Sequence, residues 1–477
     1  MRQVTLDSHP SVDKHVVLHL TPAGATVSGR LLAGEEITHR VRPIPVATIN
    51  TTAREVLRRC NGKMALRGIV QQMLENCNAA DSENEPEQML NGVLEFVQQA
   101  LQYGILELRR IPAEQPIRIT GSTEYFVPPH VSVELTSGCN LQCVYCYRDS
   151  GPHAAMFLPG EQLMDILEEL IQNGLRSVEL TGGEPLLHPQ FKAILDFCVK
   201  QLDRVALLTN GTLIDEETAK QLWLHKETVL VQVDLDGSAP NLHDALRGVP
   251  GAFERTKHAI ELLAEHDVST RVAMNVTKHN LNDIENTLLL AKRLGATWFS
   301  FAPVLDFGRA RNIDTAFSVE QIEYVSHLSQ RMHEEHGSFF NSLRSDVFRS
   351  EFSNLRNCGA GYRTAALGPT GEVRPCPILP EQYLMIGDLT KQSVSEVFSN
   401  PIVAKLHELE WPSEEICGEC KYTLYCRYCH TRGIVTQAKL ESPCEWIRAN
   451  ELEEWVSVAA NTSLTSDKPC KTDTFCV

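Results

Sequence analysis

Apolar and polar residues alternate with two different periods in the first part of this chain. Residues 12–40 alternate in short runs, as small antiparallel strands do. Three amphipathic segments with the spacing of helices follow: 49–57, 66–74 and 89–101. The first has a cap at Asn50 or Thr51, and a short apolar run at 105–108 closes the region. This order predicts a small winged-helix-like α+β domain over residues 1–111.

From Val131 onward, apolar runs of strand length alternate with amphipathic runs of helix length. The predicted strands are 131–135, 178–180, 205–208, 229–235, 269–276 and 298–301. The predicted helices between them are 160–173, 189–201, 215–223, 252–266 and 281–294. This alternation is typical of βαβ units, so it predicts an α/β fold with a parallel sheet. The proline-rich segment 112–129 is the expected linker between the two regions.

Length and composition describe a soluble protein of several domains. The chain has 477 residues, 43% of them hydrophobic and 22% charged, which suggests two to four domains. No apolar run approaches the roughly 20 residues that span a bilayer, and the N-terminus lacks a signal sequence, so we expect a cytoplasmic protein without a membrane partner. The net charge of −17 argues against a nucleic-acid partner, because phosphate contacts need clustered Lys and Arg.

The distribution of the cysteines indicates metal binding. Fifteen cysteines are present, and three of them fall in one short loop as Cys139-x3-Cys143-x2-Cys146. Such clusters in a reducing compartment favour metal ligation over disulfides. A zinc site usually takes four ligands in two pairs, and an odd triplet cannot pair internally. An iron–sulfur cube normally takes four thiolates, so three would leave one iron open for chemistry.

This loop resembles the cluster motif of the radical S-adenosylmethionine (SAM) superfamily. Tyr145 supplies the aromatic residue before the third cysteine, and Val178-Glu179-Leu180-Thr181-Gly182-Gly183-Glu184-Pro185 resembles the family's G-G-E-P motif. The resemblance implies a partial (β/α)6 TIM-like barrel over residues 130–345, a 4Fe-4S cluster on Cys139, Cys143 and Cys146, and SAM on the open iron. Reductive cleavage of SAM would release a 5′-deoxyadenosyl radical.

The resemblance also implies residues that contact SAM. Gly182, Gly183 and Glu184 would recognise the methionine amino group, and Asp234 would contact the ribose where the family usually has serine. Arg247 is a candidate for the SAM carboxylate, with a loop ion pair as the alternative. Three more residues close strand ends and are candidates to line the pocket, each with a turn or capping role as the alternative: Asn210, Asn275 and Arg309.

The C-terminal cysteines resemble the SPASM iron–sulfur extension, expected over residues 346–455 and followed by a tail at 456–477. By that resemblance, one auxiliary cube would be held by Cys417, Cys420, Cys426 and Cys444. A second would be held by only three thiolates: Cys358, Cys376 and Cys429. The spacing between Cys426 and Cys429 is one residue shorter than usual, which puts the ligand sets in doubt. Two zinc ribbons are the alternative.

The incomplete second set leaves two alternatives open. Its open iron would bind a substrate thiolate, which gives a thioether-forming enzyme, or Cys470 or Cys476 would fold back from the tail to close it. The tail pair is equally consistent with free thiols in a disordered end.

The N-terminal region resembles the PqqD-like peptide-recognition domains of ribosomal-peptide (RiPP) maturation systems, through Ile49–Gly62 and Phe96–Leu108. That resemblance implies a precursor peptide whose leader adds as a strand to an exposed sheet edge. The expected activity is a radical SAM oxidoreductase that forms a thioether or carbon–carbon cross-link in the core peptide, with a reductase, flavodoxin or ferredoxin as electron donor. Alternatives are a sulfatase- or quinone-cofactor-type maturase, an epimerase, an excision enzyme, a peptide-binding scaffold and an iron–sulfur redox sensor. Pro377, after Cys376, argues mildly against the sulfatase type.

Overall fold

A computed structural model describes residues 4–29, 47–76, 85–153, 155–305, 308–312, 317–340, 356–379, 384–437, 440 and 444–455. The chain forms two compact units: one comprises Met1–Val127 and Glu168–Leu175, and the other comprises Pro128–Leu167 and Arg176–Val477. No helix in the described ranges is long and apolar enough to cross a membrane.

The first unit contains a four-stranded sheet, a separate strand pair and three helices. The sheet has the order β4-β3-β2-β6, and β1 pairs antiparallel with β5. The strands are β1 (His9–Val12), β2 (Val16–Thr21), β3 (Gly24–Gly29), β4 (Ala47–Ile49), β5 (Leu106–Arg109) and β6 (Arg118–Gly121). The helices are α1 (Thr51–Arg59), α2 (Leu66–Asn76) and α3 (Glu85–Gln102). The three predicted helices and the closing strand are therefore confirmed.

The core of this unit forms where the apolar faces of the helices meet the sheet. Leu57, Ile69 and Val97 come from the three helices and are fully buried with Leu18 of β2. Helix α1 begins as predicted, because Asn50 Oδ1 accepts the N–H of Ala53 at 2.9 Å.

Strand β6 lies inside the segment expected to be a linker. It pairs in parallel with β2 from Val17 opposite Arg118 to Leu20 opposite Gly121. The prolines that suggested a linker stand outside the strand, at 112, 116, 128 and 129, and they leave its backbone donors intact. The sequence prediction missed this strand because it is short and both of its faces are partly exposed.

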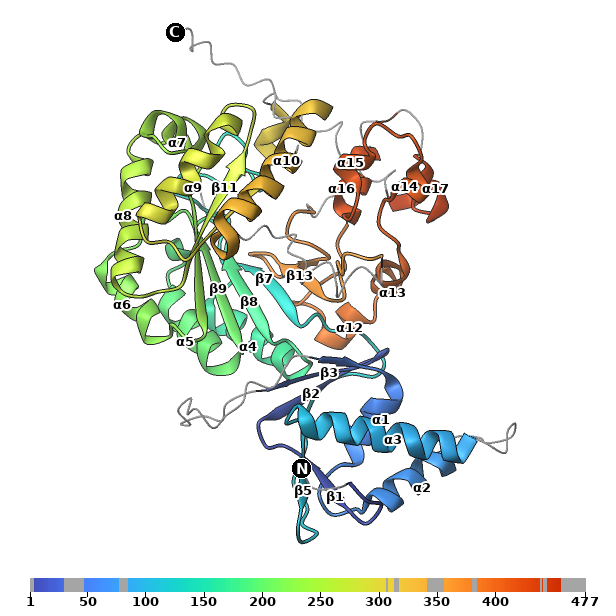
Figure 1. Ribbon diagram of the computed structural model, residues 1–477. Helices are drawn as coiled ribbons and strands as arrows, with labels where there is room; N and C mark the ends of the chain where they lie inside the picture. The colour runs from blue at the N-terminus through green and yellow to red at the C-terminus, as the bar shows by residue number, and fades with distance from the viewer. Residues whose placement is uncertain are drawn as a thin grey trace. The chain divides into compact units, whose positions relative to one another are not determined.

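The second unit is built on six parallel strands that follow one another in chain order, with helices around them (Figure 1). The strands are β7 (His130–Glu134), β8 (Ser177–Thr181), β9 (Arg204–Thr209), β10 (Val229–Asp234), β11 (Thr270–Val276) and β12 (Trp298–Pro303). The helices are α4 (Gly160–Gln172), α5 (Phe191–Gln201), α6 (Glu216–Leu224), α7 (Pro240–Arg247), α8 (Ala252–Glu265), α9 (Ile284–Arg293) and α10 (Val319–His336). All six strands and five of these helices match the prediction, and α7 and α10 are additional.

The C-terminal cysteine-rich region continues the same sheet. Strand β13 (Thr364–Leu367) pairs in parallel with β7, and β14 (Glu372–Arg374) and β15 (Gly387–Asp388) extend it antiparallel to nine strands. Short helices follow: α12 (Val394–Phe398), α13 (Pro401–Glu408), α14 (Glu414–Cys417), α15 (Thr423–Cys426), α16 (His430–Gln437) and α17 (Glu445–Ala449). The expected boundary at 345/346 and the tail from 456, with Cys470 and Cys476, lie outside the described residues.

Candidate active site

The loop that carries Cys139, Cys143 and Cys146 follows the carboxyl end of β7. The backbone N–H of Cys139 donates to Gly151 O at 3.0 Å, and that of Cys146 donates to Cys143 O at 3.2 Å. Burial raises the pKa of Cys139 to about 12, and the nearby Cys143 and Cys146 thiols contribute to this rise. The structure therefore brings the three predicted sulfurs together at the end of the first barrel strand.

Polar hydrogens from three different elements point at these sulfurs. The Leu141 N–H lies 3.4 Å from Cys139 Sγ, and Asn210 Nδ2 lies 3.9 Å from the same atom. Arg247 Nη1 lies 3.8 Å from Cys143 Sγ. Such donors stabilise thiolates and tune iron–sulfur clusters, so the surroundings fit a cluster-bound set. Among the described residues, no group of three or more His, Cys, Asp or Glu is arranged so that it could hold a metal ion.

The turn Gly182-Gly183-Glu184 packs directly on the backbone that leads to Cys139. Gly183 N donates to Thr136 O at 2.7 Å, and Glu184 N donates to Gly138 O at 2.9 Å. A Cβ on Gly183 would lie 2.0 Å from Gly138 O, and Gly182 has a φ of +131°. Both glycines are therefore required by the close approach of two protein backbones, whereas the sequence had suggested the approach of a ligand.

Glu184 ties the ends of β8 and β9 together. Its carboxylate accepts from Thr209 Oγ1 at 2.7 Å, from Asn210 N at 2.9 Å and from Leu186 N at 3.3 Å. Burial raises the pKa of Glu184 to about 7, although these donors favour its ionised form. The carboxylate thus has protein partners on both oxygens, a role that the motif alone did not indicate.

Asp236 organises the network beside the thiol loop, and the sequence prediction missed it. It is fully buried, accepts from the Tyr145 hydroxyl and from Asn275 N at 2.9 Å, and forms an ion pair with Arg247 Nε at 2.7 Å. The available signal was its place directly after the carboxyl end of β10, two residues beyond Asp234. Asp234 is more exposed and lies 3.6 Å from Arg247 Nη1.

Arg247 forms an ion pair, which was the alternative to binding the SAM carboxylate. Its guanidinium nevertheless keeps N–H groups that could donate to a ligand. Its side chain is 4% exposed, it pairs with Asp236, and its Nη2 has no hydrogen-bond partner in the described structure. A buried, unpartnered guanidinium nitrogen close to Cys143 fits a carboxylate ligand. Tyr145 lies beneath the guanidinium, with the Arg247 Cζ 5.7 Å from the centre of its ring.

Arg309 holds both ends of the thiol loop. Its Nε donates to Cys143 O at 2.8 Å, its Nη2 to Ser150 O at 2.7 Å, and its Nη1 pairs with Asp149 at 2.7 Å. The preceding Gly308 has a φ of +52°, and a Cβ there would lie 2.3 Å from Cys146 O. Arg309 therefore supports the loop from behind rather than lining the pocket.

The buried imidazole of His243 makes the stability of the folded protein depend on pH. Its Nδ1 accepts the Asp236 N–H at 3.1 Å, and burial, together with Arg247, lowers its pKa to about 3. Because the folded pKa lies below the unfolded one, the wild type loses stability as pH falls below about 6.5. We expect His243→Asn, which keeps an acceptor but cannot titrate, to gain about 2 kcal/mol over the wild type between about pH 6.5 and about pH 5. Denaturant unfolding at a series of pH values checks this, and parallel profiles would contradict it.

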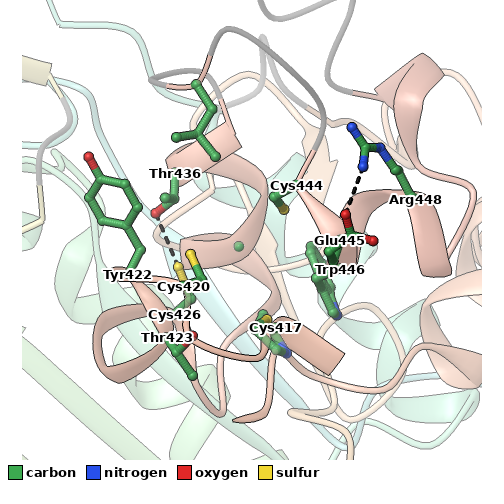
Figure 2. Close-up of a pocket in the computed structure, with 13 residues that line it drawn as sticks. Cys417, Cys420, Tyr422, Thr423, Cys426, Thr436, Cys444, Glu445, Trp446 and Arg448 are labelled. Atoms are coloured by element: carbon green, nitrogen blue, oxygen red, sulfur yellow. Dashed lines mark hydrogen bonds and ion pairs between the residues drawn. The ribbon is translucent and has the colours of Figure 1, made fainter. Parts of the chain in front are cut away.

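Four C-terminal cysteines surround one cavity of about 340 Å³ (Figure 2). They are Cys417, Cys420, Cys426 and Cys444. Trp446 forms one wall, anchored by its indole N–H to Glu410 O at 2.7 Å, and the Thr436 hydroxyl lies 3.2 Å from Cys426 Sγ. The structure thus gathers the four sulfurs that the sequence had assigned to one auxiliary cube.

The other three C-terminal cysteines form a separate group. These thiols are close enough to interact electrostatically with one another: Cys358, Cys376 and Cys429. Burial raises the pKa of each. The first residues of α16 face them: hydrogen bonds from His430 N to Cys358, from Thr431 Oγ1 to Cys376 and from Arg432 N to Cys429 oppose that rise. A helix start that donates to three sulfurs fits a thiolate cluster.

The short spacing between Cys426 and Cys429 has a structural explanation. Tyr428, between them, has a φ of +67°, which is the left-handed region. This reversal of the chain lets Cys426 face the cavity while Cys429 faces the three-thiol group. Two intervening residues are therefore enough to separate the two sets.

Comparison with known proteins identifies the chain. Residues 133–291 match the Radical SAM superfamily, residues 358–421 the SPASM iron–sulfur cluster-binding domain, and residues 45–106 coenzyme PQQ synthesis protein D. The antilisterial bacteriocin subtilosin biosynthesis protein AlbA of Bacillus subtilis is 30% identical over 458 residues, which are 94% of this chain and 98% of AlbA. The chain belongs to the radical SAM superfamily.

Two further proteins are similar to this chain. The sporulation killing factor maturation protein SkfB of Bacillus subtilis is 28% identical over 60% of this chain and 68% of SkfB. The crystal structure of Streptococcus suis SuiB bound to precursor peptide SuiA aligns with a TM-score of 0.59 at 16% identity, over 91% of this chain and 98% of that one. At that identity the likeness shows the fold.

The protein is therefore a radical SAM enzyme with a SPASM iron–sulfur cluster-binding domain, and 4Fe-4S clusters and SAM are its cofactors. This confirms the predicted family, fold, enzyme class and cofactors. The PqqD match covers α1, α2 and α3 of the first unit, where the sequence had indicated a peptide-recognition domain.

Proposed function

We propose that this enzyme forms a thioether cross-link between a cysteine and an unactivated carbon of its core peptide. The observation that carries this proposal is the separation of the C-terminal cysteines into a group of four and a group of three. Four thiolates complete a cube, whereas three leave one iron open. That iron is available for the thiolate of a substrate cysteine.

We assign the ligands by these groups. Cys139, Cys143 and Cys146 hold the SAM cluster; Cys417, Cys420, Cys426 and Cys444 hold the complete auxiliary cube; and Cys358, Cys376 and Cys429 hold the open one. The amide, guanidinium and α16 N–H donors described above support the thiolate form in the SAM and open sets. A carbon–carbon cross-link would need no open iron, so the three-thiol group favours the thioether.

At the SAM site, residues of this chain would hold the methionine and ribose parts of SAM. SAM bound at the cluster supplies a 5′-deoxyadenosyl radical after reductive cleavage. We assign the unpartnered Nη2 of Arg247 to its carboxylate, and the edge formed by Asp234 and the carbonyls of the Gly182–Glu184 turn to its ribose and amino group. Asn275, whose N–H donates to Asp236, lines the same strand ends.

The overall reaction balances without an external oxidant. The peptide carbon would give a hydrogen atom to the radical that SAM supplies, the cysteine sulfur would bond to that carbon and release its proton, and one electron would go to the auxiliary iron–sulfur clusters that the C-terminal cysteines would hold. The peptide loses two hydrogens, and the electron used to cleave SAM is matched by the one released. A flavodoxin, ferredoxin or reductase would supply the first electron.

The first unit supports capture of the leader peptide. In its described sheet, β4 and β6 have one strand neighbour each, so each presents an open edge to a further strand. Leader binding by strand addition uses backbone hydrogen bonds for affinity and side-chain pockets for specificity. We place the reaction in the cytoplasm, without nucleic-acid or membrane partners, in keeping with the acidic composition.

Co-expression with short candidate precursors, followed by mass spectrometry, tests this function. The thioether predicts a loss of two hydrogens and one cysteine that no longer reacts with iodoacetamide. A loss of two hydrogens with all cysteines still reactive would instead show a carbon–carbon link. An unchanged mass would favour epimerisation, and loss of a fragment would favour excision.

Metal content tests the ligand groups independently of the peptide. We expect about 12 iron per chain after anaerobic reconstitution, because three cubes carry four each. Iron and acid-labile sulfide assays measure it. About four iron per chain would remove both auxiliary clusters from the proposal.

A further inference from the structure

A buried charge network joins the two loops that carry Cys146 and Cys376. Glu134, at the end of β7, and Arg374, at the end of β14, are both almost fully buried, and Arg374 Nη2 lies 2.5 Å from Glu134 Oε1. Arg148 Nη2 lies 2.9 Å from the other carboxylate oxygen and 3.6 Å from Glu372 Oε1. Arg374 and Arg148 therefore share the buried carboxylate of Glu134. Glu372 lies close to Arg148 as a second acidic residue.

Both arginines of the network stand two residues from a cysteine in the sequence. Arg148 follows Cys146 by two residues, and Arg374 precedes Cys376 by two. Arg374 Nη1 also donates to Pro377 O and to Leu379 O, both at 3.1 Å. Its guanidinium thus holds the segment immediately after Cys376 while it pairs with the strand that leads to Cys139.

The side chains between these loops are packed. Tyr147, next to Cys146, and Cys376 both pack against the apolar core that contains Leu379, Leu406 and Trp446. Glu372 lies over Gly368, where an added Cβ would be 1.7 Å from its carboxylate oxygen. The network therefore sits in a region with little room for rearrangement.

The sheet does not need these charges in order to form. Strands β7, β13 and β14 are already joined by backbone pairing. Buried ion pairs rarely add net stability over apolar residues, because each charge loses its hydration, and specificity of geometry is their best-supported benefit. Here, the geometry that the charges would fix is the distance between the loop of Cys146 and the loop of Cys376.

We propose that Glu134, Arg374 and Arg148 are positioning residues that hold the loop of Cys146 and the loop of Cys376 at a fixed separation. Within the proposed function, on which this inference rests, a peptide radical made at the first loop must pass its electron on at the second as the carbon–sulfur bond forms. A radical that is not oxidised in time takes a hydrogen atom from the reductant, and 5′-deoxyadenosine is then formed without cross-linked peptide.

Arg374→Lys is the sharpest test, because lysine keeps the charge but cannot reach the carboxylate and both carbonyls at once. The control is Arg176→Lys: Arg176 pairs through two nitrogens with Asp203, at 3.0 and 2.8 Å, at the opposite ends of the strands. We expect Arg374→Lys to keep its iron and its SAM cleavage, but to release roughly five times more 5′-deoxyadenosine per cross-linked peptide. Arg176→Lys should match the wild type.

A second readout does not depend on turnover. Redox titration followed by electron paramagnetic resonance should show a shifted midpoint potential for one auxiliary cluster in Arg374→Lys only, because the guanidinium that holds Pro377 O and Leu379 O, just after Cys376, has been removed. If Arg374→Lys does not fold, the double variant Glu134→Gln/Arg374→Met removes both charges of the buried pair together and leaves Arg148 paired with Glu372, 3.6 Å away. It should give the same shift and the same excess of 5′-deoxyadenosine.

Wild-type ratios and wild-type potentials in these variants would overturn the inference. Failure of the proposed function looks different, since the wild type itself would then produce no thioether. In that case the potential shift alone still decides whether the network positions the auxiliary site.

Discussion

Cys143→Ala should abolish SAM cleavage while the protein remains folded. Cys143 is the middle ligand of the loop after β7, and its sulfur is the one that Arg247 faces at 3.8 Å. Without it, the cluster lacks a protein ligand on one iron and cannot hold SAM in place for electron transfer. We expect 5′-deoxyadenosine formation under dithionite to fall by roughly a thousandfold, equivalent to about 4 kcal/mol in the barrier. Chromatography of the nucleoside products measures this.

Cys198→Ala is the matched control for that variant. Cys198 is a fully buried thiol on α5, packed in the core of the barrel and away from the thiol loop. It should keep its iron and its SAM cleavage, and lose only the small stability of one buried sulfur. Retention of SAM cleavage by Cys143→Ala would contradict the assignment of the loop. If the protein were an iron–sulfur redox sensor instead, the wild type itself would not be expected to cleave SAM.

Cys376→Ala should separate SAM cleavage from peptide modification. Cys376 belongs to the three-thiol group and follows β14, on the side of the sheet extension. We expect 5′-deoxyadenosine formation to stay within about threefold of the wild type and thioether product to fall by roughly a hundredfold, about 3 kcal/mol. The iron content should fall from about 12 to about eight per chain.

A comparison of Cys376→Ala with loss of Cys420 discriminates between the three-thiol group and the four-thiol cavity. Loss of Cys420, which is exposed at the four-thiol cavity, should also remove about four iron, but it leaves the iron that would bind the substrate thiolate. If Cys376→Ala made thioether at the wild-type rate, the three-thiol group would have no direct role in bond formation.

The positions of the thiols in the fold show how the three proposed clusters could share one chain. The SAM loop and the three-thiol group are both supported by the nine-stranded sheet, because β13 and β14 continue the sheet beyond β7 (Figure 1). The four-thiol cavity is built from short helices that follow. Its four cysteines all lie within one stretch of the chain, from Cys417 to Cys444.

Features whose signal is local could be predicted from the amino-acid sequence. The alternation of strands and helices from Val131 gave all six barrel strands, because hydrophobic period and turn residues act over a few positions. The thiol loop and the division of the C-terminal cysteines could be assigned from spacing and family resemblance. The three N-terminal helices and the Asn50 cap were also predictable, since capping is a contact between residues three apart.

Features that depend on residues distant in the chain became visible in the folded structure. Strand β6 owes its place to pairing with β2, about 100 residues earlier, and no local pattern specifies that partner. The need for Gly183 comes from Gly138 O, and the role of Asp236 comes from Tyr145, Asn275 and Arg247 on three other segments. The Glu134–Arg374 pair joins residues 240 positions apart, which meet because β13 lies between their strands. Long-range packing and burial therefore assigned these roles, since a side chain's partner, unlike its helical or strand period, is not written in its neighbours.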